Sequence, residues 1–223
     1  MDIGAAALPS GRLRLYNGFV TSVDVAQTSL TLGAAQRDRD ASEIERAAGA
    51  VHYVIANSAP GKLGHIKLNK ILWYADLDYF RKHGRSITGL QHYLRAPHGP
   101  WSRTIVRAVR WLVRQGLVIE RSVGAAAELR REFVSLKPPD MTALTVQQTN
   151  ILQRMMQVVL PLTARELLNM TNADPLWQET ELNEPMLIST GSIVTRSPAT
   201  AEVIPLHLAT DPEGRRRPSA RRA

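Results

Sequence analysis

Repeated helix start and stop signals between residues 42 and 195 constrain this chain more than any other feature of its sequence. Capping boxes, in which Ser or Thr precedes Glu or Gln by three positions, mark helix starts. They occur at Ser42/Glu45, Thr145/Gln148 and Thr163/Glu166. Glycine and proline, which favour helix ends, follow at short intervals. These signals predict five short helices, at about 42–56, 66–82, 98–115, 145–160 and 163–171.

The sequence also predicts a small sheet. The third helix is expected to open at His98-Gly99-Pro100, because proline is well tolerated in a first helical turn. Short extended segments are expected between the helices, at 86–96, 117–122, 131–136 and 186–194. The predicted fold class is α+β, a mainly helical single domain of about five helices with a small, mostly antiparallel sheet.

The two ends of the chain differ from this central segment. Residues 1–41 show little helical periodicity, and we expect an N-terminal extension that is either disordered or a short hairpin of residues 13–16 and 19–25 around Asn17-Gly18. Residues 42–195 are expected to form the folded domain. Residues 196–223 are expected to form a C-terminal extension with a disordered basic tail, because five arginines lie among the last nine residues.

Composition argues against several classes of protein. The net charge is +8, but the tail supplies much of it, so nucleic acid is a less favoured partner. The absence of cysteine excludes disulfides and thiolate metal sites and fits a reducing cytoplasm. No run approaches the roughly 18 apolar residues of a membrane helix, and the N-terminus does not resemble a secretory signal. We expect a cytoplasmic protein with no membrane partner.

No sequence pattern indicates catalysis. The six histidines are scattered and include no H-E-x-x-H pair. The G-x-S-x-G, Walker-type and G-x-G-x-x-G motifs are absent. Asp76 and Asp78 are two residues apart on an expected helix, so they point to different faces and do not form an acid/base pair. We therefore predict no enzymatic activity, no catalytic residue, no cofactor and no metal.

The helix expected at 98–115 carries a one-sided strip of arginines. They are Arg103, Arg107, Arg110 and Arg114, and the core face is expected to consist of Val106, Val109, Leu112 and Val113. Such a strip is either a solvated basic face or an anion-binding strip for phosphates or an acidic protein surface. Because two strands follow, it also suggests a winged-helix-like DNA-binding transcriptional regulator. Regularly spaced arginines offer few side chains that read bases, so this regulator is the alternative hypothesis.

Exposed aromatic residues near this strip would be candidate anchors for a partner, because Trp and Arg dominate binding hot spots. Trp73 is out of phase with the apolar stripe of its helix, and Trp101 lies at the start of the next one. The candidate partner-binding residues are Trp73, Trp101, Arg103, Arg107, Arg110 and Arg114.

Five motifs give the sequence a family resemblance over about 42–195. Residues 67–76, KLNKILWYAD, resemble the K-L-x-K-L-L-Y-Y-A-D signature of the Panacea (SocA-like) family of bacterial antitoxins. Four further motifs follow in the family's order: GRSITG at 84–89, Y with PHGP within 93–100, LVRQGLV at 112–118, and TAREL through PLW within 163–177. The signature positions are Lys67, Lys70, Tyr74, Asp76, Gly99, Pro100 and Trp177.

The resemblance implies an antitoxin that neutralises a co-encoded toxin by direct protein–protein binding, with phage defence among the roles to expect. Some relatives deliver the toxin to a protease as adaptors, so a cellular protease is a second partner to consider. The resemblance also implies that Lys67, Lys70 and Asp76 matter for structure or partner contact rather than for turnover. We expect Asp76 to be partly buried and hydrogen-bonded to backbone or arginine, so that Asp76→Ala costs ~1–3 kcal/mol of stability.

Overall fold

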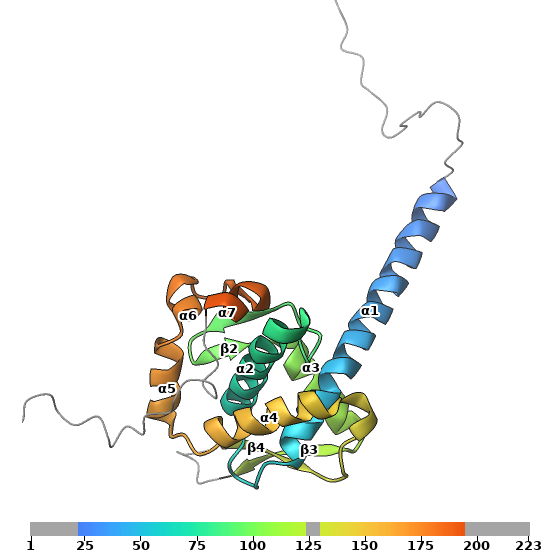
Figure 1. Ribbon diagram of the computed structural model, residues 1–223. Helices are drawn as coiled ribbons and strands as arrows, with labels where there is room; N and C mark the ends of the chain where they lie inside the picture. The colour runs from blue at the N-terminus through green and yellow to red at the C-terminus, as the bar shows by residue number, and fades with distance from the viewer. Residues whose placement is uncertain (1–21, 124–129, 195–223) are drawn as a thin grey trace, which may run out of the picture. The chain divides into compact units, whose positions relative to one another are not determined.

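The computed structural model describes residues 22–123 and 130–194 of the 223-residue chain (Figure 1). The chain divides into two compact units, residues 1–40 and 41–223. The helices of the described residues are α1 (Ser22–Ala56), α2 (His65–His83), α3 (Arg103–Arg114), α4 (Val146–Val159), α5 (Ala164–Asn172), α6 (Pro175–Glu179) and α7 (Ile188–Val194), with a 3₁₀ turn at Met141–Ala143. The strands are β1 (His92–Ala96), β2 (Gly99–Trp101), β3 (Val118–Val123), β4 (Arg130–Ser135) and β5 (Pro185–Leu187). This α+β, mainly helical architecture confirms the predicted fold class.

α1 begins at Ser22, well before the start predicted at Ser42. Residues 22–56 contain no proline, and the first part of this segment is rich in Ala, Gln, Arg and Leu, which have good helix propensity. The periodicity argument missed this part because it carries no clear apolar stripe. The expected strand at 19–25 is therefore a wrong prediction for residues 22–25, which are helical. The rest of the expected hairpin lies outside the described residues.

α2 is the central element of the second unit. Every residue from Leu68 to Tyr79 is buried, and the helix contacts α4, α7 and β2 (Figure 1). Gly84 caps its C-terminus, as predicted, with a left-handed backbone (φ 63°) and an N–H that donates to the Phe80 carbonyl at 2.8 Å. Because residues 68–79 of α2 are buried on all sides, their side chains are placed to hold the surrounding elements together.

Residues 99–101 form a strand and Ser102 is a helix cap, so the predicted helix start at His98-Gly99-Pro100 is wrong. Gly99 has a φ of 134°, which a helix does not use and which favours glycine. β2 pairs antiparallel with β1, and Leu94 lies opposite Trp101. α3 then begins at Arg103, where the Ser102 hydroxyl accepts the N–H of Thr104 at 3.2 Å.

Two small antiparallel sheets complete the unit. One has the order β2-β1-β5, and the other is the β3–β4 hairpin, in which Val118 lies opposite Ser135. The hairpin confirms the strands predicted at 117–122 and 131–136. Of the segment 86–96, only β1 is a strand.

The C-terminal part of the second unit is more helical than predicted. Both capping boxes, at Thr145 and Thr163, start helices as expected. The strand predicted at 186–194 is limited to β5, and the remainder is α7. Gly191 allows α7 to approach α2 closely, since a Cβ at this position would lie 2.8 Å from Leu77 and 3.1 Å from Trp73. This packing, which no local pattern shows, favours the helix.

Candidate partner-binding surface

Asp76 of α2 is fully buried and organises the loop that leads into β1. Its Oδ1 accepts the backbone N–H groups of Ile87 and Thr88, at 2.8 and 3.0 Å. Its Oδ2 accepts the hydroxyls of Thr88 and Tyr93, at 2.6 and 2.9 Å. These contacts confirm the predicted burial and backbone hydrogen bonds, with hydroxyl donors in place of the arginine considered beforehand.

The environment of Asp76 shifts two pKa values. Burial raises the pKa of the Asp76 carboxyl to about 6, although its four hydrogen bonds oppose that rise. Burial, followed by the nearby Asp76 carboxylate, raises the pKa of Tyr93 well above its ordinary value. Both shifts are consequences of placing a polar cluster in the core, where it fixes the path of residues 87–93.

Lys70, another signature residue, links α2 to β2 and α5. The side chain is fully buried, and its Nζ donates to the Leu167 carbonyl at 3.1 Å. β2 lies directly over it, because a Cβ at Gly99 would be 2.9 Å from Nζ. Burial lowers the pKa of Lys70 to about 8, while the Asp174 carboxylate opposes the fall. The φ of Gly99 favours glycine, and any larger residue at this position would also displace the end of the Lys70 side chain.

Two further side chains of α2 hold the neighbouring elements. Lys67 Nζ donates to the Leu160 carbonyl at 2.6 Å, at the C-terminal end of α4. Asn69 Oδ1 accepts the N–H of Ser102 at 3.1 Å. Through Asn69, α2 therefore fixes the point at which β2 ends and α3 begins.

Trp73 is buried, so its candidate role as a surface anchor is not supported. Its exposed fraction is 0%, and its Nε1 donates to Asp174 Oδ2 at 3.4 Å. Helical periodicity could not predict the burial of Trp73, because α2 has no exposed side along its central turns.

The two aromatic signature residues, Tyr74 and Trp177, are also buried. Burial raises the pKa of Tyr74, and the charge of Asp174 and a hydrogen bond to it raise this pKa further. Trp177 packs below the Arg95 guanidinium, which lies 4.7 Å from the ring centroid.

The exposed side of α3 carries the predicted arginine strip. Arg103, Arg107, Arg110 and Arg114 are all exposed, and we call this surface the α3 face. The opposite side buries Ile105, Ala108, Val109 and Leu112 in the core. Val113 was expected in the core, but its exposed fraction is 39%, which adds an apolar edge to the α3 face. Val106 and Trp111 are half-buried.

A hollow of about 300 Å³ lies beside the N-terminal end of α3. It is lined by Trp101, Arg103 and Thr104, by residues 89–92 of the loop that Asp76 holds, and by Glu43, Leu94 and Ser102. Trp101 is half-buried, so part of the indole is accessible. The structure therefore brings two sequence-predicted partner residues, Trp101 and Arg103, to the same hollow.

Asn69, Ser102 and Asp174 were not predicted from the sequence, although they contact or position the signature residues and the elements around them. The Asp174-Pro175 pair is a detectable signal, because aspartate at an N-cap followed by proline at the first helical position is typical of a helix start. No group of three or more His, Cys, Asp or Glu side chains that could hold a metal is found in residues 22–123 and 130–194. Within the same residues, no helix is long and apolar enough to cross a membrane.

Comparison with known families gives one match. Residues 68–178 match the family model described as "Antitoxin SocA-like, Panacea domain". No curated protein and no solved structure gives a match. The matched segment runs from α2 into α6 and includes the buried polar contacts of Asp76 and Lys70 as well as the α3 face.

Proposed function

Since residues 68–178 belong to the Panacea domain of SocA-like antitoxins, we propose that this protein neutralises a co-encoded toxin by binding it directly through the α3 face. The family supports an antitoxin role in general and implies a toxin as partner. We choose the α3 face because the core residues of α3 and its exposed arginines lie on opposite sides of the helix. The arginines are therefore not part of the core.

The chemistry of the α3 face suits an acidic protein surface. Four guanidinium groups create a positive field that speeds association with an oppositely charged partner. Each guanidinium can also bind a carboxylate through two parallel hydrogen bonds. The accessible part of Trp101 and the exposed Val113 add apolar contact area at the two ends of the strip.

Buried polar residues of α2 support this surface without belonging to it. Asn69 and Lys70 fix the junction of β2 and α3, and Asp76 fixes the loop beside Trp101. A rigid surface loses less conformational entropy on binding, so more of the contact energy appears as affinity. We therefore assign these residues a structural role rather than a role in turnover.

DNA binding is the alternative, and a specific observation favours it: α3 is followed directly by the β3–β4 hairpin, as in a winged helix. Against it, Arg121 and Arg131 of the hairpin are paired with Glu132 and Glu120. Duplex affinity that falls steeply with salt and differs between sequences would favour the regulator.

Growth rescue tests the proposal. The product of the neighbouring gene is expressed alone, with this protein, and with its Arg107→Glu/Arg110→Glu variant. We expect the unaltered protein to restore growth and the variant to fail, because reversing two charges replaces attraction by repulsion on the partner side. A matched control, Lys62→Glu/Arg165→Glu, makes the same change of charge at exposed sites outside the α3 face and should restore growth.

The variant must remain folded for its failure to be informative. Both arginines are exposed, so we expect the variant to unfold cooperatively in urea, as the unaltered protein does. Rescue by the variant at the level of the unaltered protein would reject the α3 face as the toxin-binding surface.

The same cells test whether the protein also acts as an adaptor for a protease. If it does, the amount of toxin should fall on co-expression and recover when the protease is deleted. Simple neutralisation leaves the amount of toxin unchanged.

A further inference from the structure

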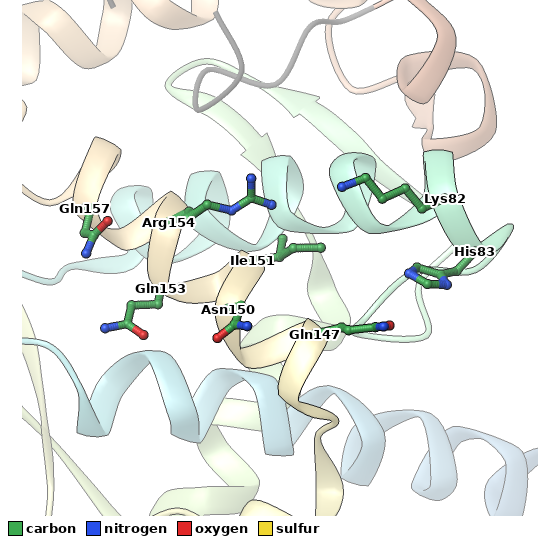
Figure 2. A pocket seen from close by; sticks show the side chains of 8 residues that line it. All are labelled: Lys82, His83, Gln147, Asn150, Ile151, Gln153, Arg154 and Gln157. Carbon is green, nitrogen blue, oxygen red and sulfur yellow. The ribbon is translucent and has the colours of Figure 1, made fainter.

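A second hollow, of about 730 Å³, lies between the C-terminal end of α2 and α4. Its lining consists of Lys82 and His83 from α2 and of Gln147, Asn150, Ile151, Gln153, Arg154 and Gln157 from α4 (Figure 2). Ile151 is buried and supplies an apolar floor. In Figure 2, Lys82 extends along α2 towards Arg154, and Gln147 extends towards His83. We call this hollow the α2–α4 groove.

The exposed surface of α4 is unusual in being built from neutral amides. The solvent-facing side of a helix carries charged or polar residues, and on α4 these are almost all uncharged, because α4 contains no acid and a single base, Arg154. Gln147, Asn150, Gln153 and Gln157 are all exposed and recur at steps of three, three and four. Side chains at this spacing share one side of a helix, so the groove presents a ladder of primary amides.

The charge of the groove is positive. None of its eight lining residues is acidic. Beside the groove, the buried Asp78 contacts two arginines, Arg154 at 2.9 Å and Arg81 at 3.8 Å. Lys82 is exposed and adds a cationic group, and the exposed His83 beside it adds a polar ring.

We propose that the α2–α4 groove binds an extended peptide segment that carries an acidic side chain. Each primary amide offers both donors and an acceptor, which matches the alternating N–H and C=O groups of an unpaired peptide backbone. The ladder from Gln147 to Gln157 spans ~15 Å at the rise of an α-helix. An extended peptide of roughly four or five residues covers that length. Lys82 and His83 then contact the acidic side chain.

Nucleic acid fits the groove less well than a peptide does. Proteins that bind single strands stack bases on aromatic side chains, and the lining of the groove contains no Trp, Tyr or Phe. The proposal is independent of the toxin-binding role assigned to the α3 face, since the two surfaces share no residue.

Nuclear magnetic resonance tests the proposal on the full chain, because the side-chain NH₂ signals of Asn and Gln report directly on the ladder. The probe is an acetylated and amidated hexapeptide of alternating Ser and Glu. We expect saturable shifts of the NH₂ signals of Gln147, Asn150, Gln153 and Gln157, each identified by the loss of its signal in a single Ala variant. A hexapeptide with Gln in place of Glu should bind about tenfold more weakly, because the charged contact with Lys82 is lost.

Three variants locate the effect. Lys82→Glu should weaken binding of the Ser-Glu peptide by about tenfold or more, and Lys82→Gln, which introduces no repulsion, should weaken it less. Lys62→Glu is the matched control, and neither it nor Arg107→Glu/Arg110→Glu should change the affinity by more than about twofold, since neither alters the groove.

Several outcomes would overturn the proposal. They are the absence of saturable shifts in the four NH₂ signals, equal binding by the unaltered protein and both Lys82 variants, or equal binding of the Glu and Gln peptides. A six-nucleotide oligothymidylate that shifts the same signals at lower concentration than the peptide would identify a phosphate-binding groove instead. Failure of the α3 variant to neutralise toxin, with peptide binding intact, would bear on the toxin-binding surface alone.

Discussion

Replacing Asp76 is the sharpest test of how the buried polar cluster supports the fold. The carboxylate is fully buried and accepts four hydrogen bonds. Asp76→Ala leaves two backbone N–H groups, of Ile87 and Thr88, without their acceptor, and they cannot reorient as a hydroxyl can. Each unsatisfied buried donor costs ~1–3 kcal/mol. Relief of carboxylate burial offsets part of this, so we expect a loss of ~2–5 kcal/mol in the free energy of unfolding.

Asp76→Asn separates hydrogen bonding from charge. The amide oxygen can still accept the N–H groups of Ile87 and Thr88, and its NH₂ group can donate to the hydroxyls of Thr88 and Tyr93. We expect this variant to lose only about 1–2 kcal/mol, because the acceptor for the fixed backbone donors is kept.

Urea denaturation followed by circular dichroism measures both losses. Glu179→Ala is the control, because Glu179 is an exposed acid, and it should change the free energy of unfolding by no more than about 0.5 kcal/mol. A loss below about 1 kcal/mol for Asp76→Ala, or equal losses for the Ala and Asn variants, would refute the reasoning.

Three further predictions concern the core and the limits of the domain. The pKa of Lys70 is about 8 in the folded protein and 10.5 ordinarily. Between pH 8 and pH 10.5 the unfolded chain therefore binds more protons than the folded protein does. The free energy of unfolding should rise across this range by about 3 kcal/mol. Chemical denaturation at a series of pH values should show this rise, and Lys70→Met should show a smaller one, because Lys67, whose pKa burial also lowers, is retained. Gly191→Val should cost ~2 kcal/mol or more in urea denaturation because its side chain would collide with Trp73 and Leu77, and a smaller loss would mean that α7 can shift. A chain of residues 39–210 should still unfold cooperatively on heating, and a broad, non-cooperative transition would contradict the domain limits proposed from the sequence.

The sequence predicted those elements whose ends depend on local bonds. The capping boxes at Thr145 and Thr163 and the glycine cap at Gly84 are satisfied within a few residues, so their patterns identify helix ends directly. β2 was predicted as helix because its structure depends on pairing with β1 and on the Lys70 side chain beneath Gly99. Such contacts join residues far apart in the sequence, and no local pattern encodes them.

The candidate surface was predictable to a similar extent. The steps between Arg103, Arg107, Arg110 and Arg114 place them on one side of any helix, so the α3 face followed from spacing alone. The burial of Trp73 could not be predicted in the same way. Helical periodicity separates a buried side from an exposed side only when the helix has both, and the middle of α2 is buried throughout. The hollow beside Trp101 combines residues from α1, the 89–92 loop and α3, and only the fold brings these together.

The affinity of the purified protein for the purified product of the neighbouring gene tests the central claim most directly. Biolayer interferometry should show direct binding, and the Arg107→Glu/Arg110→Glu variant should bind at least about 30-fold more weakly, since a desolvated charge pair that loses one member costs ~2–5 kcal/mol. The Lys62→Glu/Arg165→Glu control should bind like the unaltered protein. Absence of direct binding, or equal affinity of the α3 variant and the unaltered protein, would contradict the account.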